Sequence, residues 1–289
     1  MDYKFENSIL PLISIGDKIG INVLDDVYMY TTKIVNLFLI GNPETEGSFS
    51  LIDSGMPKCA DEIIKAVEDR FGKGAKPASI ILTHGHFDHV GSLAELLERW
   101  EVPVYAHRLE LPYLTGRADY PKGDPETDGG LVSELSPLFP NHGINLGNRI
   151  EALPNNGGVP GLEEWIWVHT PGHTPGHISL FRERDRSLIA GDAFVTVKQE
   201  SLYKVLTQTQ EISGPPKYYT TDWEAAYQSV KELLFLKPVL AVTGHGLPMN
   251  GDELVEALDY LVSHFNQIAV PEHGKFVRKG TNINRGYSQ

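Results

Sequence analysis

The sequence predicts an α/β protein. Short apolar strands alternate with amphipathic helices along most of the chain, and polar turns rich in Gly, His and Asp follow several of these strands. The 289 residues are enough for one large domain or two small ones with a buried core. A hydrophobic content of 41% with 22% charged residues is typical of a globular protein and too apolar for a disordered one.

The N-terminal half supplies strand, helix, strand and helix in that order. The expected elements are strand sequence over 19–40, strands over 50–52 and 79–82, and helices over 61–71 and 92–100. Each of the two short strands ends in a polar turn, the first at Asp53 and the second at a run of histidines. Ser92 and Glu95 are spaced as an N-cap and its third helical position.

The C-terminal half repeats the pattern less regularly. We expect strands over 165–168, 178–181, 188–190 and 239–242, and amphipathic helices over 223–234 and 254–265. The intervening region over 107–161 is rich in Pro, Gly, Asp and Asn, and long loops of this kind are usually lids or binding loops. The polar tail after Val270 is expected to be a peripheral arm.

Composition and charge restrict the partners. Lys and Arg number 25 against 38 Asp and Glu, a formal net charge of −13. Nucleic-acid binding requires clustered basic residues, so nucleic acid is not expected as a partner. The first 14 residues do not read as a secretory signal, and the apolar segment over 35–41 is far shorter than the ~20 residues of a membrane helix. We therefore expect a cytoplasmic protein without a membrane partner that acts on a small-molecule substrate. Homo-oligomer formation is compatible with the sequence.

Histidines outnumber cysteines by 11 to one. Cys59 alone cannot form an internal disulfide or a thiolate zinc cluster. Three imidazoles and a carboxylate, by contrast, fall within six residues directly after the strand over 79–82: His84, His86, Asp88 and His89. Nitrogen and oxygen donors without thiolate favour Zn²⁺, with Fe or Mn as alternatives. The competing interpretation is an exposed histidine-rich loop that binds metal only adventitiously.

Further candidate ligands also follow strands. His173 comes after the strand that ends at Val168, Asp192 follows the strand over 188–190, and His245 follows the strand over 239–242. Open α/β sheets place their ligand sites at the carboxyl ends of strands. This repeated placement predicts that the candidate ligands form one metal site.

The run His-x-His-x-Asp-His over 84–89, followed by His173, Asp192 and His245 in that order, resembles the metallo-β-lactamase superfamily of metallohydrolases. The resemblance covers about 19–246 and leaves a C-terminal helix and tail over 247–289. It implies a four-layer αβ/βα sandwich, in which two mixed sheets pack face to face with helices on the outer faces.

The same resemblance implies a single domain over 1–289 and a dinuclear site. Asp53 matches the acid that supports the metal site in this family. One ion would be held by three histidines and the other by a mixed set, with one bridging carboxylate, as follows: His84, His86 and His173; Asp88, His89 and His245; and Asp192 as the bridge. Two such ions with two carboxylates and a bridging hydroxide retain a net positive charge, which stabilises a developing oxyanion.

This site predicts a metal-dependent hydrolase. A dinuclear centre lowers the pKa of a bridging water to about 7 or below, and the resulting hydroxide can attack a small ester, lactone or thioester carbonyl. Asp88 is expected to accept a proton as well as to bind metal. Asp192 resembles the bridging acid of the hydroxyacylglutathione hydrolase, lactonase and phosphodiesterase branches, which true β-lactamases typically lack. The net charge of −13 and the lack of a basic cluster disfavour the phosphodiesterase branch. Val195 stands where quorum-signal lactonases have a tyrosine, and only 44 residues follow His245, so the physiological substrate is not assigned.

Two other interpretations stay open. The same scaffold can be a non-hydrolytic mononuclear iron protein that resembles a sulfur oxygenase, or a metal-binding module without activity. His169 and His177 are expected to support the site rather than to bind metal. Four further histidines are expected to be ordinary surface or loop residues: His107, His142, His264 and His273. Four aromatic residues are expected either to line a substrate pocket or to pack in the core: Phe194, Tyr218, Tyr219 and Trp223.

Overall fold

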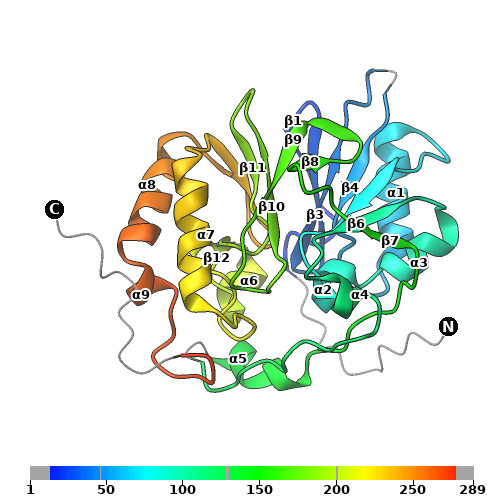
Figure 1. Cartoon of the computed structure of the whole chain (residues 1–289). Helices are drawn as coiled ribbons and strands as arrows, with labels where there is room; N and C mark the ends of the chain where they lie inside the picture. Colours follow the sequence, from blue (N-terminus) through cyan, green and yellow to red (C-terminus); the bar gives the residue numbers. More distant parts are fainter. Residues whose placement is uncertain (1–13, 46, 128–129, 200, 278–289) are drawn as a thin grey trace. The chain divides into compact units, whose positions relative to one another are not determined.

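A computed structural model describes residues 14–45, 47–127, 130–199 and 201–277 (Figure 1). Residues 1–13, where the sequence does not predict a secretory signal, lie outside these ranges. The part of the polar tail beyond residue 277 also lies outside them. The chain divides into two compact units, Met1–Tyr120 with Pro140–Ile166 and Pro121–Phe139 with Trp167–Gln289. We describe each unit by itself, and the single domain over 1–289 stays a prediction.

The first unit contains a seven-stranded mixed sheet whose strands lie in chain order. Its members are β1 (Gly20–Leu24), β2 (Val27–Thr32), β3 (Val35–Ile40), β4 (Ser50–Ile52), β5 (Ser79–Ile81), β6 (Val104–Ala106) and β7 (Ile150–Ala152). The strands from β1 to β4 pair antiparallel, and those from β4 to β7 pair parallel. All six residues of β3 are buried, as expected for a central strand covered on both faces.

Four helices of the first unit follow its strands. They are α1 (Ala60–Phe71), α2 (Phe87–Val90), α3 (Leu93–Arg99) and α4 (Leu111–Leu114). The predicted helices over 61–71 and 92–100 are therefore confirmed to within a residue. The capping interaction is wrong, however. Ser92 occupies the N-cap position, but its hydroxyl donates to the Met56 carbonyl at 2.6 Å and accepts from the Cys59 amide at 2.9 Å.

A six-stranded sheet has the order β15-β14-β11-β10-β9-β8. The bounds are β8 (Gly158–Val159), β9 (Leu162–His169), β10 (Ile178–Arg182), β11 (Ser187–Ile189), β14 (Leu240–Val242) and β15 (Met249–Asn250). A separate ribbon pairs β12 (Val195–Val197) with β13 (Gln210–Ser213). The longer segment of the second unit begins within β9, at Trp167. In this unit β11 pairs parallel with β14, and β10 pairs antiparallel with β11.

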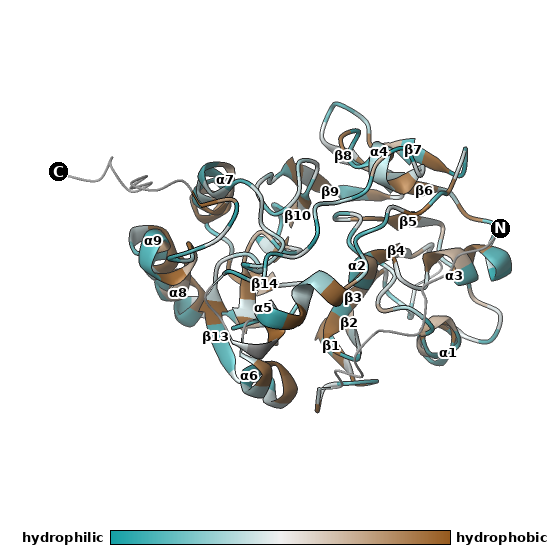
Figure 2. Ribbon diagram, turned by 90° about the horizontal axis from the view of Figure 1, so that it is seen from below, coloured by the Kyte–Doolittle hydropathy of each residue, from teal (hydrophilic) through white to brown (hydrophobic). Residues whose placement is uncertain are grey.

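The helices of the second unit are α5 (Leu131–Leu135), the 3-10 turn η1 (Ser136–Leu138), α6 (Leu202–Thr207), α7 (Trp223–Phe235), α8 (Gly251–Ser263) and α9 (Phe265–Ile268). The helix expected over 254–265 is therefore split, because α8 ends before His264 and α9 begins after it. Helices α7 and α8 lie side by side (Figure 1). The ribbon of α8 carries both hydrophilic and hydrophobic segments, as an amphipathic helix should (Figure 2).

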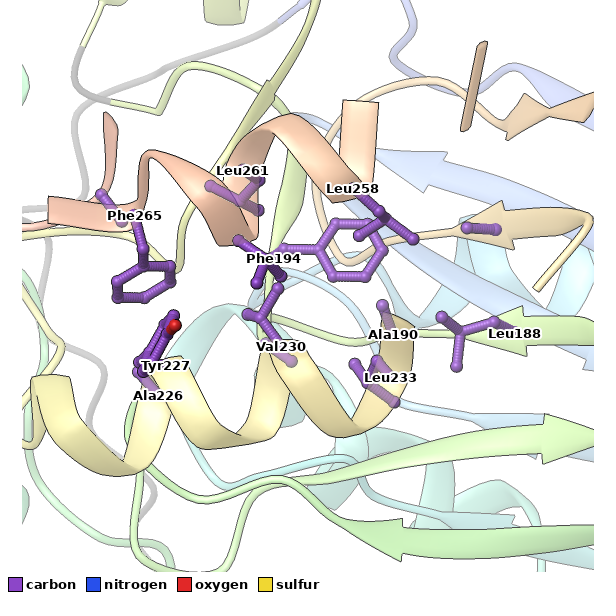
Figure 3. Close-up of a cluster of buried hydrophobic side chains, with 14 of the residues drawn as sticks. Leu188, Ala190, Phe194, Ala226, Tyr227, Val230, Leu233, Leu258, Leu261 and Phe265 are labelled. Carbon is purple, nitrogen blue, oxygen red and sulfur yellow. The ribbon is translucent and has the colours of Figure 1, made fainter. Parts of the chain in front are cut away.

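Apolar side chains from these two helices form the core of the second unit (Figure 3). Val230 and Leu233 of α7 and Leu258 of α8 are fully buried, and Phe194 lies between the two helices. Burial of each such side chain contributes about 1.5–3 kcal/mol relative to exposure. Because Ala190, just after β11, belongs to the same cluster, this core anchors the chain directly before Asp192.

None of the helices in the described part of the chain is long and apolar enough to cross a membrane.

Candidate functional site

Predicted ligands of the first unit lie at the carboxyl ends of two adjacent strands. Strands β4 and β5 are parallel, with Ile52 opposite Ile81, so the chain leaves both at the same edge of the sheet. Asp53 directly follows β4, and its amide donates to the Ile81 carbonyl at 2.9 Å. The turn from Thr83 to His89 follows β5. The topology therefore brings Asp53 to the histidine-rich turn.

Asp53 is fully buried and adopts a left-handed backbone conformation with φ of 59°. Aspartate is among the few residues that visit this region, at a cost of about 1–2 kcal/mol. Several hydrogen bonds offset that cost. Oδ1 accepts from the Thr83 amide at 2.8 Å, while Oδ2 accepts from the Thr83 hydroxyl at 2.7 Å and from His89 Nδ1 at 2.8 Å.

These bonds orient two histidine rings. A carboxylate only accepts, so the proton between Asp53 and His89 lies on Nδ1 of the imidazole. The Thr83 hydroxyl donates to Asp53, and it therefore accepts from His84 Nδ1 at 3.1 Å. In both rings the proton is on Nδ1, and Nε2 is the nitrogen suited to bind a metal. A carboxylate that supports metal-binding histidines in this way raises the basicity of the ligands.

The remaining predicted ligands of this unit are close to the same rings. Candidate donor atoms of His84 and His86 lie within 4.8 Å of each other, as do those of His84 and His89. Oδ2 of Asp88 is 3.9 Å from Nε2 of His89, beyond hydrogen-bond range. Two donors on one tetrahedral zinc ion are roughly 3.3 Å apart, given bond lengths near 2.0–2.1 Å. The spacing and the donor types therefore fit a metal ion.

The second unit repeats this arrangement. Strands β11 and β14 are parallel, with Ile189 opposite Val242, and Asp192 and His245 each come three residues after their strand. Backbone bonds continue the pairing beyond the strands, from Ala190 N to the Val242 carbonyl at 2.8 Å and from Gly244 N to the Gly191 carbonyl at 2.9 Å. His173 lies in the turn between β9 and β10.

Asp192 lies between two imidazoles. Its Oδ2 atom is 3.5 Å from Nε2 of His173 and 3.4 Å from Nε2 of His245, and all three side chains are about 2% exposed. The other ring nitrogen of His173, Nδ1, is 3.2 Å from the hydroxyl of Thr220. This hydroxyl donates to the Pro216 carbonyl at 2.8 Å. His173 Nδ1 is thus a donor, and Nε2 again faces the carboxylate.

His177 and His169 stabilise the turn that carries His173. His177 Nε2 accepts from the Asp192 amide at 2.8 Å, and its Nδ1 is 3.1 Å from the Thr170 carbonyl. His169 Nε2 is 2.9 Å from the Pro175 carbonyl. In both residues Nε2 makes a protein contact. That the two histidines support a metal site stays a prediction.

A glycine is required within this turn. Gly172 has φ of 133°, and a Cβ atom placed on it would lie 2.4 Å from the Ala226 amide nitrogen at the start of α7. The turn therefore approaches α7 more closely than any side chain permits.

Two residues near the first cluster were missed from the sequence. The Gly85 amide, between two predicted ligands, donates to Oε2 of Glu110 at 3.0 Å and is 3.1 Å from the Tyr120 hydroxyl. Tyr120 itself donates to Glu110. Burial, followed by the charge of Glu110, raises the pKa of Tyr120 well above its usual value, so the hydroxyl keeps its proton. The only signal was the expectation that the region over 107–161 is functional.

The other histidines and aromatic residues divide as follows. His107 lies in the loop directly after β6, one of the two expected placements, and is buried there, with 6% exposure. Phe194 and Trp223 pack in the core of the second unit, whereas Tyr218 and Tyr219 contact each other with ring centroids 5.0 Å apart. The other three histidines of this group, His142, His264 and His273, are exposed, as expected of surface residues.

Comparison with known proteins identifies the family. A match to the metallo-beta-lactamase superfamily spans residues 30–245. The probable metallo-hydrolase YflN of Bacillus subtilis (strain 168) is 48% identical over 259 residues, which are 90% of this chain and 98% of that protein. The chain therefore belongs to the metallo-β-lactamase superfamily, as its motifs predicted.

Solved structures show the same fold. A beta-lactamase domain protein from Burkholderia ambifaria has a TM-score of 0.60 at 20% identity, with 88% of this chain and 78% of that chain covered. The protein TTHA1623, solved in a di-iron-bound form, has a TM-score of 0.52 at 26% identity, with 77% of this chain and 92% of that chain covered. These similarities confirm the predicted fold class, an α/β sandwich of mixed sheets with helices.

Proposed function

We propose that the ligands of the two units form one dinuclear metal centre and that the chain is a metal-dependent hydrolase. The proposed assignment gives His84, His86 and His173 to one ion, Asp88, His89 and His245 to the other, and Asp192 to both. One observation carries it. Asp192 Oδ2 is nearly equidistant from His173 and His245, which this assignment places on different ions, and a bridging carboxylate must neighbour ligands of both.

Zinc is the metal we propose, because imidazole and carboxylate donors suit it. The distances between neighbouring donor atoms, 3.4–3.9 Å, are also near the roughly 3.3 Å that separates two donors on one zinc ion. Iron is the alternative, supported by the di-iron form of the related protein TTHA1623. Iron accepts imidazole and carboxylate donors as well, so metal analysis of the purified protein distinguishes the two.

When bound, the metal pair supplies an activated water and a Lewis acid for a carbonyl oxygen. The chain's own residues prepare this chemistry. Asp53 and Thr83 fix the tautomers of His84 and His89. Asp88 is proposed to accept the proton of the attacking water and to transfer it to the leaving group, and its side chain retains partial exposure of 12%, which allows that exchange.

The proposed substrates are small esters, lactones or thioesters. The name of the relative YflN, a probable metallo-hydrolase, supports hydrolysis in general. The bridging acid at Asp192 supports a branch other than the true β-lactamases. Val195 is buried in β12 and offers no hydroxyl to a lactone oxyanion, so esters and thioesters are favoured over quorum-signal lactones.

Metal analysis and a substrate panel test this proposal. The purified protein is loaded with zinc and assayed on lactones, thioesters, aryl esters, phosphodiesters and β-lactams. We expect about two zinc ions per chain and turnover of an ester or thioester. Asp192→Ala should lose turnover and at least one ion, whereas Asp252→Asn, at an exposed position of α8, should retain both.

Other results would contradict the proposal. A single redox-active iron would favour the mononuclear, non-hydrolytic interpretation. Two bound zinc ions without turnover of any substrate class would favour a metal-binding module.

A further inference from the structure

The peptide between the first two predicted ligands is held by groups from a distant part of the chain. Glu110 and Tyr120 follow Gly85 by 25 and 35 residues in the sequence. The Gly85 amide nevertheless donates to both side chains, to Oε2 of Glu110 and to the hydroxyl of Tyr120. We propose that these two residues position the turn from His84 to His86 and thereby set the metal affinity of the first cluster. The part of this inference that concerns metal rests on the proposed function.

The first argument is the cost of burying Glu110. Glu110 is fully buried, and a buried carboxylate is tolerated only when it accepts hydrogen bonds. Oε2 accepts from the Gly85 amide and from the Tyr120 hydroxyl. The Gly85 amide and the Glu110 carboxylate therefore serve as hydrogen-bond partners for each other. If the turn moved, this bond would break and both groups would lose a buried partner.

The second argument is steric. A Cβ atom on Gly85 would lie 2.5 Å from the Tyr120 hydroxyl oxygen and 3.0 Å from Cδ2 of Leu114. Gly85 is not among the described residues with positive φ, so its backbone conformation is open to other residues. The glycine is needed because Tyr120 and Glu110 approach its amide closely.

The third argument is the contact with a ligand ring. The Tyr120 ring meets the His86 ring edge-on, with centroids 4.5 Å apart and an angle of 61° between the planes. Tyr113 stacks on Tyr120 with centroids 4.0 Å apart and an angle of 12°. Tyr120 is therefore held between an aromatic neighbour and Glu110, and it transmits that order to His86.

The charge of Glu110 acts in the same direction. Its carboxylate accepts from the Gly85 amide, between His84 and His86, and Glu110 itself is fully buried. A negative charge in such a position favours a bound cation, because a low-dielectric interior screens it weakly. Glu110 thus contributes both a hydrogen bond and a field.

Zinc affinity measured by competition with a chelating dye tests the inference. We expect Tyr120→Phe and Glu110→Ala each to lower the affinity by about 10–100-fold, the range typical for groups that support metal ligands. Glu110→Gln keeps an oxygen that can accept from Gly85 but removes the charge, so it should fall between wild type and Glu110→Ala. Tyr203→Phe is the matched control. It removes the same hydroxyl from a tyrosine that is 73% exposed on α6, and should bind zinc as wild type does.

Hydrogen exchange of the Gly85 amide in the metal-free protein is an independent measurement. The amide should exchange faster in Tyr120→Phe and Glu110→Ala than in wild type and Tyr203→Phe. If both variants matched wild type in zinc affinity and in Gly85 exchange, the inference would be wrong. If wild type itself bound no zinc, the proposed function would fail, while the exchange data would still decide the positioning role. Tyr120→Phe and Glu110→Gln keep the test intact if Glu110→Ala does not fold.

Discussion

Oδ2 of Asp53 lies 2.8 Å from Nδ1 of His89, and the same oxygen accepts the Thr83 hydroxyl that in turn accepts from His84. One carboxylate therefore determines the tautomer of two histidines. Because Asp53 is buried and takes a left-handed backbone conformation, it has little freedom to serve any other purpose.

Asp53→Asn should reduce zinc affinity by about 10–100-fold, since it removes the charge that fixes Nδ1 of His89 as donor. Asparagine tolerates the same backbone conformation, so the fold should survive. Competition titration with a chelating dye measures the effect, and Asp61→Asn, at a position on α1 with 83% side-chain exposure, is the control. Equal zinc affinity for Asp53→Asn and wild type would contradict the role assigned to Asp53.

His177→Ala should destabilise the protein by about 1–3 kcal/mol, because the buried Asp192 amide loses its acceptor. His169→Ala should cost less, since its Pro175 contact is exposed to water. Urea unfolding of the metal-free proteins measures both values. A larger loss for His169→Ala than for His177→Ala would reverse the assigned importance of the two residues.

Cys59 should resist thiol reagents in the folded protein. Burial raises its pKa to about 11, so the reactive thiolate is scarce at neutral pH, and the side chain is 2% exposed. We expect a disulfide reagent to modify no thiol in buffer and one thiol per chain in urea. Rapid modification in buffer would show that the start of α1 opens.

Asp119 should stabilise the protein in a pH-dependent way. The Gly143 amide, with a smaller contribution from His142, holds the pKa of Asp119 below its usual value of 3.8. A group whose pKa is lower in the folded protein stabilises it fully above the unfolded pKa, and loses this effect as pH falls through the folded pKa. Urea midpoints of wild type and Asp119→Ala should therefore differ at pH 7 and converge below the usual pKa. A gap that stays constant would contradict this expectation.

Much of the site could be predicted because its signals are local. A strand followed within three residues by Asp or His is visible in the sequence, and this pattern located Asp53, Asp192 and His245 at strand ends. Glu110 and Tyr120 carry no such signal. Their role depends on contacts with Gly85 across 25 and 35 residues, which no local pattern encodes.

The fold shows the same limit. Strands β4, β5 and β11 were predicted because they are buried and continuous in apolar character. Strands β6 and β7 were missed, since they are not buried throughout: Tyr105 of β6 is only partly buried, and the last two residues of β7 are exposed. Helix α6 was missed as well, because its six residues, Leu202–Thr207, are too few to show a helical hydrophobic period, although Ser201 is a local N-cap that accepts from Lys204 N. The Ser92 capping interaction was wrong because that hydroxyl bonds to the Met56 carbonyl instead.

The parallel pairing of β11 with β14 also has a consequence for the time at which the ligands assemble. These strands are separated by the residues over 190–239, whereas β4 and β5 are joined by a single helix. Closure of the longer loop costs more entropy and is slower, and an emerging chain folds from its N-terminus. We expect the Asp53–His89 pair to form early during synthesis. Asp192 can meet His245 only after β14 has been synthesised, so the second pair of ligands would assemble after the first.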